Sequence, residues 1–273
     1  MAVSKLAART GDILLMVGTV KGAFIFLSDA ARGNFRMSGP HFPGQSVWSA
    51  AFIGNGAARI IVGNKSEHWG AMVSHSDDFG ATWTEPTEGN IKFPAGSSVS
   101  LNSIWALETA TSLGPEVVLA GVDPAALFRS DDRGETFQLN EALFNHPDRS
   151  KWNPGFGGLC LHSILVHPHD PRRMYVAISS GGIYRSDDGG GSWTTCVNGL
   201  RVHPDVPGAT CARTSCVSMR KTLPVCICKI IQGYIAPAMK GAGGSRLKTA
   251  CRRISVSQWS RIRGGVGRSI PSP

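Results

Sequence analysis

Long apolar runs are missing from this sequence of 273 residues. No uninterrupted apolar stretch approaches the roughly 18–20 residues that cross a bilayer, which excludes an integral membrane protein. Near the N-terminus, Asp12 interrupts the apolar stretch before it reaches the length of a signal peptide, so we expect a cytoplasmic protein. Charged residues are also scarce, at 17% of the chain, and helical periodicity is absent, which favours a β-rich domain.

Acidic residues are almost absent from the last part of the chain. Residues 201–273 contain 13 Lys and Arg and one acid, Asp205, so their net charge is +12, whereas residues 1–200 carry −3. Five of the seven cysteines also lie in 201–273. These shifts divide the chain into the segments 1–200 and 201–273. A nucleic-acid-binding arm and a metal module are possible interpretations of the second segment, but Cys226 and Cys228 are too close together for a zinc knuckle. The cysteine spacing therefore predicts no metal. We also expect no cofactor, and a nucleic-acid partner stays the less favoured interpretation of the basic segment.

An eight-residue string of the pattern Ser-x-Asp-x-Gly-x-x-Trp/Phe recurs along the first segment. It occupies residues 76–83, 130–137 and 186–193, and a decayed copy occupies 28–35; the spacings are 48, 54 and 56 residues. We call these strings boxes 1 to 4 in chain order. The residues that define boxes 2 to 4 are Ser76, Asp78, Gly80 and Trp83, then Ser130, Asp132, Gly134 and Phe137, then Ser186, Asp188, Gly190 and Trp193.

The chemistry of each box predicts a tight turn between two strands. The aspartate can accept hydrogen bonds from nearby backbone N–H groups, the glycine tolerates a positive φ, and the aromatic residue begins the next strand. Apolar stretches precede each box in phase, at 22–27, 71–73, 126–128 and 182–184, and earlier at 13–17, 60–62, 117–120 and 174–178. Further strands are predicted to open at 47–49, 101–103 and 161–163. Four short antiparallel strands per 40–50 residues predict an all-β protein, a β-propeller with about four recognisable blades.

The boxes resemble the Asp-box, or bacterial neuraminidase repeat, of sialidase-like and glycosyl hydrolase-like repeat proteins. The resemblance covers about residues 10–200 and implies that the box acids are structural, since in these families the turn lies away from the central channel. Sialidase chemistry would need a Tyr nucleophile and a Phe/Tyr-Arg-Ile-Pro sequence, yet the chain has three tyrosines, and its nearest match is Phe35-Arg36-Met37-Ser38. The resemblance therefore favours a binding or scaffold module without a complete active site of its own. A glycoside hydrolase acting at the channel face is the alternative.

Two stretches are candidates for contacting a carbohydrate or protein ligand. The Gly-rich loop at 151–158 carries Trp152 and Phe156 and leads into the strand that contains His162. A loop that feeds the first strand of a blade opens at the channel face, although Trp152 could instead pack over the core. The second candidate is the pair His68 and Trp69, which lies between two predicted strands.

The repeat does not continue into 201–273, where a fifth box would begin near residue 236. Combining the last base of each codon with the first two bases of the next permits, from Gln232 onward, the string Gly-Val-Tyr-Arg-Ser-x-Asp-Glu-Gly-Ser-x-Trp, which is in phase with the boxes. We therefore predict that 201–273 is out of frame or disordered and that the ring of blades is incomplete. Open blade edges predict self-association.

Overall fold

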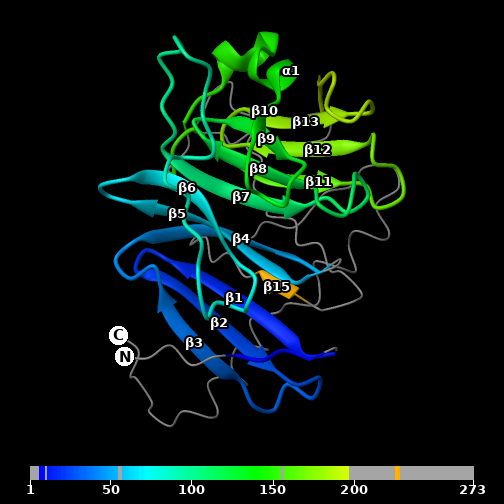
Figure 1. Cartoon of the computed structure of the whole chain (residues 1–273). Coiled ribbons are helices and arrows are strands. Elements are labelled where there is room, and N and C mark those ends of the chain that lie inside the picture. The colour runs from blue at the N-terminus through cyan, green and yellow to red at the C-terminus, as the bar shows by residue number, and fades with distance from the viewer. Residues whose placement is uncertain (1–5, 10, 55–56, 155–156, 197–224, 228–273) are drawn as a thin grey trace, which may run out of the picture. The chain divides into compact units, whose positions relative to one another are not determined.

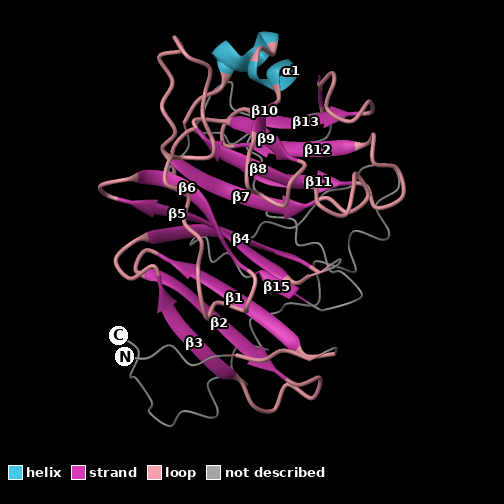
Figure 2. Cartoon of the chain, in the orientation of Figure 1, coloured by secondary structure: helices cyan, strands magenta, loops and turns pink. Residues whose placement is uncertain are grey.

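The computed structural model describes residues 6–9, 11–54, 57–154, 157–196 and 225–227. Almost all regular structure in these ranges is β-strand, as Figure 2 shows. The first sheet contains β1 (Ile13–Thr19), β2 (Gly22–Ser28), β3 (Arg36–His41) and β15 (Val225–Ile227), and the second contains β4 (Ser46–Ile53), β5 (Arg59–Ser66) and β6 (Gly70–Ser76). The third contains β7 (Ser103–Thr109), β8 (Val118–Asp123), β9 (Ala126–Ser130) and β10 (Gln138–Leu139), and the fourth contains β11 (Leu161–Val166), β12 (Met174–Ile178), β13 (Gly182–Ser186) and β14 (Thr194–Thr195). Helix is confined, within the described ranges, to α1 (Glu141–Phe144) and the 3₁₀ turn η1 (Pro147–Lys151).

The consecutive strands of each sheet form an antiparallel meander, and each sheet is one blade of a β-propeller, so the predicted fold class is confirmed. We number the blades 1 to 4 in chain order, and Figure 1 shows them following one another in that order. In blade 2, a bridge between His75 and Thr84 takes the place of a fourth strand. The first strands β4, β7 and β11 contact one another from blade to blade, as expected of the strands nearest a shared axis. In blade 1, β15 pairs in parallel with β1; the rest of the predicted segment 201–273 lies outside the described residues.

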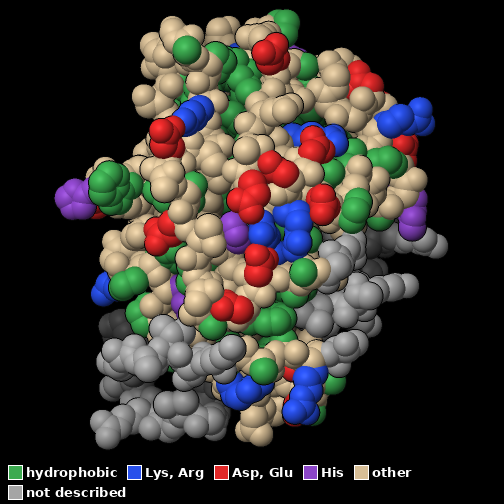
Figure 3. All heavy atoms as spheres, viewed as in Figure 1, with side chains coloured by type: hydrophobic (Ala, Val, Ile, Leu, Met, Phe, Trp, Pro, Cys, Tyr) green, Lys and Arg blue, Asp and Glu red, His purple; other side chains and the backbone are tan. Residues whose placement is uncertain are grey.

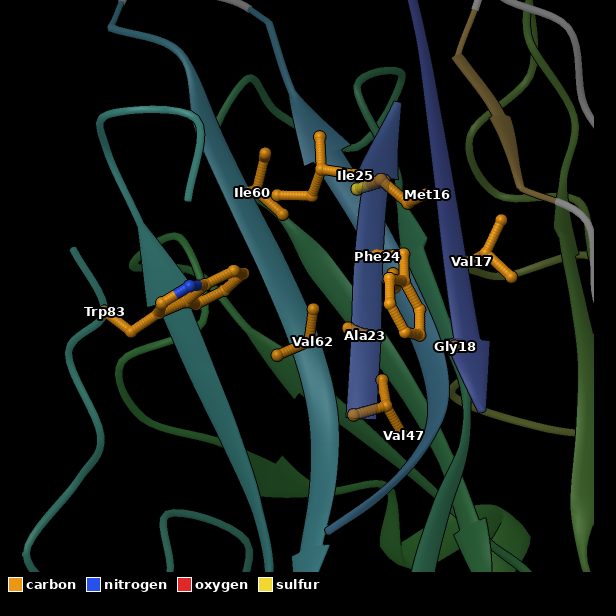
Figure 4. A pocket seen from close by; sticks show the side chains of 11 residues that line it. Met16, Val17, Gly18, Ala23, Phe24, Ile25, Val47, Ile60, Val62 and Trp83 are labelled. Carbon is orange, nitrogen blue, oxygen red and sulfur yellow. The ribbon is translucent and has the colours of Figure 1, made fainter. Parts of the chain in front are cut away.

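The hydrophobic core lies between neighbouring blades. One cluster of buried side chains joins blades 1 and 2, a second joins blades 2 and 3, and a third joins blades 3 and 4. Strands such as β8 are buried on both faces because a blade packs on each side, which explains their continuous apolar sequences. A small cavity of about 10 Å³ lies between blades 1 and 2, and Val47 and Ile60 are among the side chains that line it. Figure 4 shows these side chains from close by. The cavity holds at most one water, so it is a packing defect.

Boxes 2 to 4 form the same hydrogen-bonded turn. In box 3, Ser130 Oγ accepts from Gly134 N at 2.8 Å and donates to Asp132 Oδ1 at 2.6 Å, and Asp132 in turn accepts from the backbone N of Thr136. Arg133 and Gly134 both have positive φ, at 62° and 92°, so the fifth box position needs glycine to turn without strain. In box 4, hydrogen bonds from Ser192 and Ser186 hold the pKa of Asp188 well below its usual range.

Boxes 2 to 4 each also contact the preceding blade. In box 2, Trp83 Nε1 donates to Nδ1 of His41 at 3.1 Å, and its ring meets Phe42 edge-on. In box 4, Trp193 Nε1 donates to Asn140 Oδ1 at 3.1 Å. The boxes therefore join successive blades as well as closing a hairpin within each one.

A charged cluster reinforces the contact between blades 2 and 3. Arg59 donates to both carboxylate oxygens of Asp77, at 2.7 and 2.8 Å, and to Glu135 Oε1 in box 3 at 2.6 Å. These hydrogen bonds lower the pKa of Asp77. Figure 3 shows acidic and basic side chains intermixed on the face in view.

Candidate functional site

The first strands of blades 2, 3 and 4 each carry a β-bulge at the same position. The register shifts at Trp48 in β4, at Trp105 in β7 and at His162 in β11. A bulge places two residues of one strand opposite a single residue of its neighbour and redirects the side chain there, and bulges are common beside binding sites. The repeat therefore brings Trp48, Trp105 and His162 into a row at the beginnings of the strands nearest the axis. We call this set the bulge row.

The two tryptophans of the bulge row stack on each other. Their ring centroids are 5.2 Å apart and their planes are inclined by 20°, and both side chains stay partly exposed. The backbone at Gly157 lies against the Trp105 ring, since a Cβ there would come within 2.8 Å of Cη2. A side chain at residue 157 would therefore displace the Trp105 ring, and the two indoles together form an apolar contact across the boundary between blades 2 and 3.

A polar group lies at the same ends of the strands. Lys65 is the second-to-last residue of β5, and its Nζ donates to Asn102 Oδ1 at 2.7 Å. Asn102 Nδ2 in turn donates to Asp123 Oδ2 at 2.6 Å. Lys65 comes from blade 2, and Asp123 is the last residue of β8 in blade 3. The chain of hydrogen bonds therefore crosses the same blade boundary as the tryptophan stack.

Asp123 is the buried member of this polar group. Burial raises the pKa of its carboxyl, while the hydrogen bond from Asn102 and the charge of Lys65 oppose the rise. Gly158 closes over the carboxyl, because a Cβ at this residue would lie 2.8 Å from Oδ2. A carboxyl with a raised pKa holds its proton to a higher pH, which suits it to donating a proton or a hydrogen bond.

The structure distributes the predicted ligand-contacting residues over three environments. Trp152 is 6% exposed in the core between blades 3 and 4, where its Nε1 donates to Tyr184 OH at 2.7 Å. It therefore packs over the core, as the second interpretation of its loop anticipated, and its ring is not offered to a ligand. His162 belongs to the bulge row, and Phe156 lies outside the described residues.

His68 and Trp69 form the tip of the β5–β6 hairpin. The side chain of Trp69 is 80% exposed, and the backbone N atoms of both residues donate to Ser66 Oγ. Figure 3 shows histidine and hydrophobic side chains projecting at this hairpin. The tip lies at the same end of blade 2 as the start of β4, because Ser46 pairs with Lys65. These two residues are thus placed at the edge of the surface that carries the bulge row.

Sequence reasoning missed Trp48, Trp105 and the polar group. The predicted strand starts at 47–49, 101–103 and 161–163 were treated as equivalent, so Asn102 took the position of Trp48 and His162. In the structure β7 begins at Ser103, so the equivalent residue is Trp105. A match in which two tryptophans coincide was the signal that would have revealed the row.

Neither a metal centre nor a membrane helix is found in the described part of the chain. No three His, Cys, Asp or Glu side chains within those ranges are grouped so that they could hold a metal ion. No helix there is long and apolar enough to cross a membrane.

Comparisons with known proteins give structural neighbours alone. No protein-family model matches the chain, and no curated protein matches it. Among solved structures, the chain is similar to the GH74 xyloglucanase of Xanthomonas campestris, with 18% identity over 62% of this chain and 26% of that one, at a TM-score of 0.42. The GH74 enzyme of Niastella koreensis gives 18% identity, coverages of 71% and 31%, and a TM-score of 0.41. YCF48 from Cyanidioschyzon merolae gives 16%, coverages of 70% and 54%, and a TM-score of 0.38. The chain spans about a quarter to about a half of the length of these structures.

Proposed function

We propose that the chain is a binding or scaffold module that binds a carbohydrate on the surface formed by the bulge row. The observation that carries the proposal is the stack of Trp48 and Trp105 at equivalent bulges of neighbouring blades. The C–H face of a sugar ring is apolar and flat enough to stack on an indole. The hydroxyl groups around the ring need donors and acceptors, which Lys65 and Asn102 provide beside the tryptophans.

Titration of the full chain against an array of neutral and acidic oligosaccharides tests this proposal. We expect Trp48→Ala to weaken binding at least about tenfold, as is usual for a central aromatic contact, and Trp48→Phe to retain part of it. Trp69→Ala is the comparison variant, because it removes an exposed tryptophan at the edge of the same surface and leaves the stack intact, so it should weaken binding less. Equal losses in Trp48→Ala and Trp69→Ala would contradict the assignment to the bulge row. Binding of peptides without binding of any oligosaccharide would contradict the ligand class.

A glycoside hydrolase is the second candidate function, and Asp123 is the observation that favours it. Glycosidases use a carboxylic acid of raised pKa as the general acid, and burial gives Asp123 that property beside the stacked indoles. A screen of aryl glycosides would detect turnover that is lost in Asp123→Asn but kept in Trp69→Ala. Turnover that is unchanged in Asp123→Asn would remove this candidate while leaving the binding proposal intact.

A further inference from the structure

The contact between neighbouring blades uses the same strand positions each time. In every blade the serine that opens the box pairs with a residue of the preceding strand. The residue that follows this partner in the chain occupies an equivalent position in each blade. These residues are Leu14 in blade 1, Ile61 in blade 2, Leu119 in blade 3 and Tyr175 in blade 4. Leu14, Ile61 and Leu119 are fully buried, each in the core shared with the following blade. We call the side of a blade that carries these residues its front face.

The front face of blade 4 has no following blade within the described residues. Tyr175 is only partly buried, although its equivalents in the other three blades are fully buried. Ile183, three residues before the box serine, repeats the pattern, because its equivalents Ile25, Val73 and Leu127 are buried. An apolar face that matches three buried ones is therefore left open at the end of blade 4.

Blade 1 is open on its opposite side, the back face. The equivalent residues two positions before the box serine are Phe26, Ser74, Phe128 and Tyr184 in blades 1 to 4. Phe26 is only partly buried, whereas the other three are fully buried. Leu15 shows the same contrast with its buried equivalents Val62, Ala120 and Val176. The aromatic residue of box 1, Phe35, is 39% exposed, whereas Trp83 and Trp193 pack on a preceding blade. The front face of blade 4 therefore lacks a back face to pack against, and the back face of blade 1 lacks a front face.

We propose that the chain associates head to tail, with the front face of blade 4 of one copy packing on the back face of blade 1 of a second copy. The occupant is a second copy because the same front-to-back contact already occurs three times within one chain. Such a contact joins two different surfaces, so it closes a ring or extends into a filament. Two copies supply eight blades, which is within the range of closed propellers, so we expect a ring-shaped dimer.

Analytical ultracentrifugation of the full chain over a range of concentrations tests the proposal. Ile183→Glu on the front face and Leu15→Glu on the back face should each weaken association at least about tenfold. An equimolar mixture of these two variants should recover association, because each still carries the intact face that the other has lost. Val20→Glu, at the exposed tip of the β1–β2 hairpin and outside the positions that repeat between blades, is the matched control and should associate like the unmodified chain.

Three results would overturn the proposal. They are a monomer at every concentration, a loss of association in one face variant without the other, and a failure of the mixture to associate. Urea unfolding of each variant shows whether it keeps a cooperative fold, and Ile183→Ser and Leu15→Ser replace any glutamate variant that does not. None of these results depends on carbohydrate binding, so the test is independent of the proposed function.

Discussion

The serine that opens each box is the point at which one substitution tests the turn most directly. Ser130 Oγ accepts from Gly134 N at 2.8 Å and from Asp132 N at 3.3 Å, and it donates to Asp132 Oδ1 at 2.6 Å. Replacement by alanine removes all three hydrogen bonds and leaves the Gly134 N–H buried without its acceptor. The decayed box 1 supplies a matched control, because Ser28 Oγ is buried without a hydrogen-bond partner in the structure.

The magnitude follows from these contacts. A buried donor left without a partner costs about 1–3 kcal/mol, and a lost hydrogen bond to a charged group costs about 1.5–3 kcal/mol. Water that solvates the exposed side of Asp132 reduces the second cost. We therefore expect Ser130→Ala to lower the free energy of unfolding by about 2–4 kcal/mol. Ser28→Ala should not lower it, since no hydrogen bond is lost and a buried hydroxyl without a partner is removed.

Urea unfolding followed by tryptophan fluorescence measures both variants. The midpoint should fall in Ser130→Ala at an unchanged m-value, because the surface exposed on unfolding stays the same. Ser130→Thr, which keeps the hydroxyl, should recover part of the loss. Equal midpoints for Ser130→Ala and Ser28→Ala would refute the view that this hydroxyl holds the turn.

Three further predictions concern packing and charge. Gly121→Ala should destabilise the fold by about 1–3 kcal/mol, because its Cβ would clash with the backbone oxygen of Leu161 in the next blade. Gly33→Ala, with nothing within 4 Å, should be neutral in the same urea assay. Arg59 lowers the pKa of Asp77, so this pair stabilises the fold above the unfolded-state pKa and the effect is lost as the pH falls; Arg59→Met should flatten the acid side of a stability–pH profile. Burial raises the pKa of Asp123, so its proton-linked contribution is present at low pH and lost as the pH rises through the folded-state pKa. The Asp123→Asn variant should therefore have a higher free energy of unfolding than the unmodified chain at pH 7. A difference between the two free energies that does not shrink in acid would contradict this.

The bulge row shows where prediction from the sequence stopped. Counting residues from one box to the next gave the strands of each blade, but the innermost strands begin after loops of different length. The loop before β7 is long, so a match by sequence alone placed Asn102 where the register places Trp105. Only the pairing of β7 with β8 fixes which residue is the bulge.

Local chemistry and packing between blades therefore determined different parts of this protein. The box turns depend on hydrogen bonds between residues at most four positions apart, so the sequence alone was sufficient to predict the hairpins, the repeat and the propeller fold. The stack of Trp48 on Trp105 and the burial of Trp152 depend on contacts between strands that are distant in the chain. The register of each sheet and the packing of one blade on the next set those contacts, and for that reason the tertiary structure alone decided which aromatic residues belong to the core and which form the candidate site.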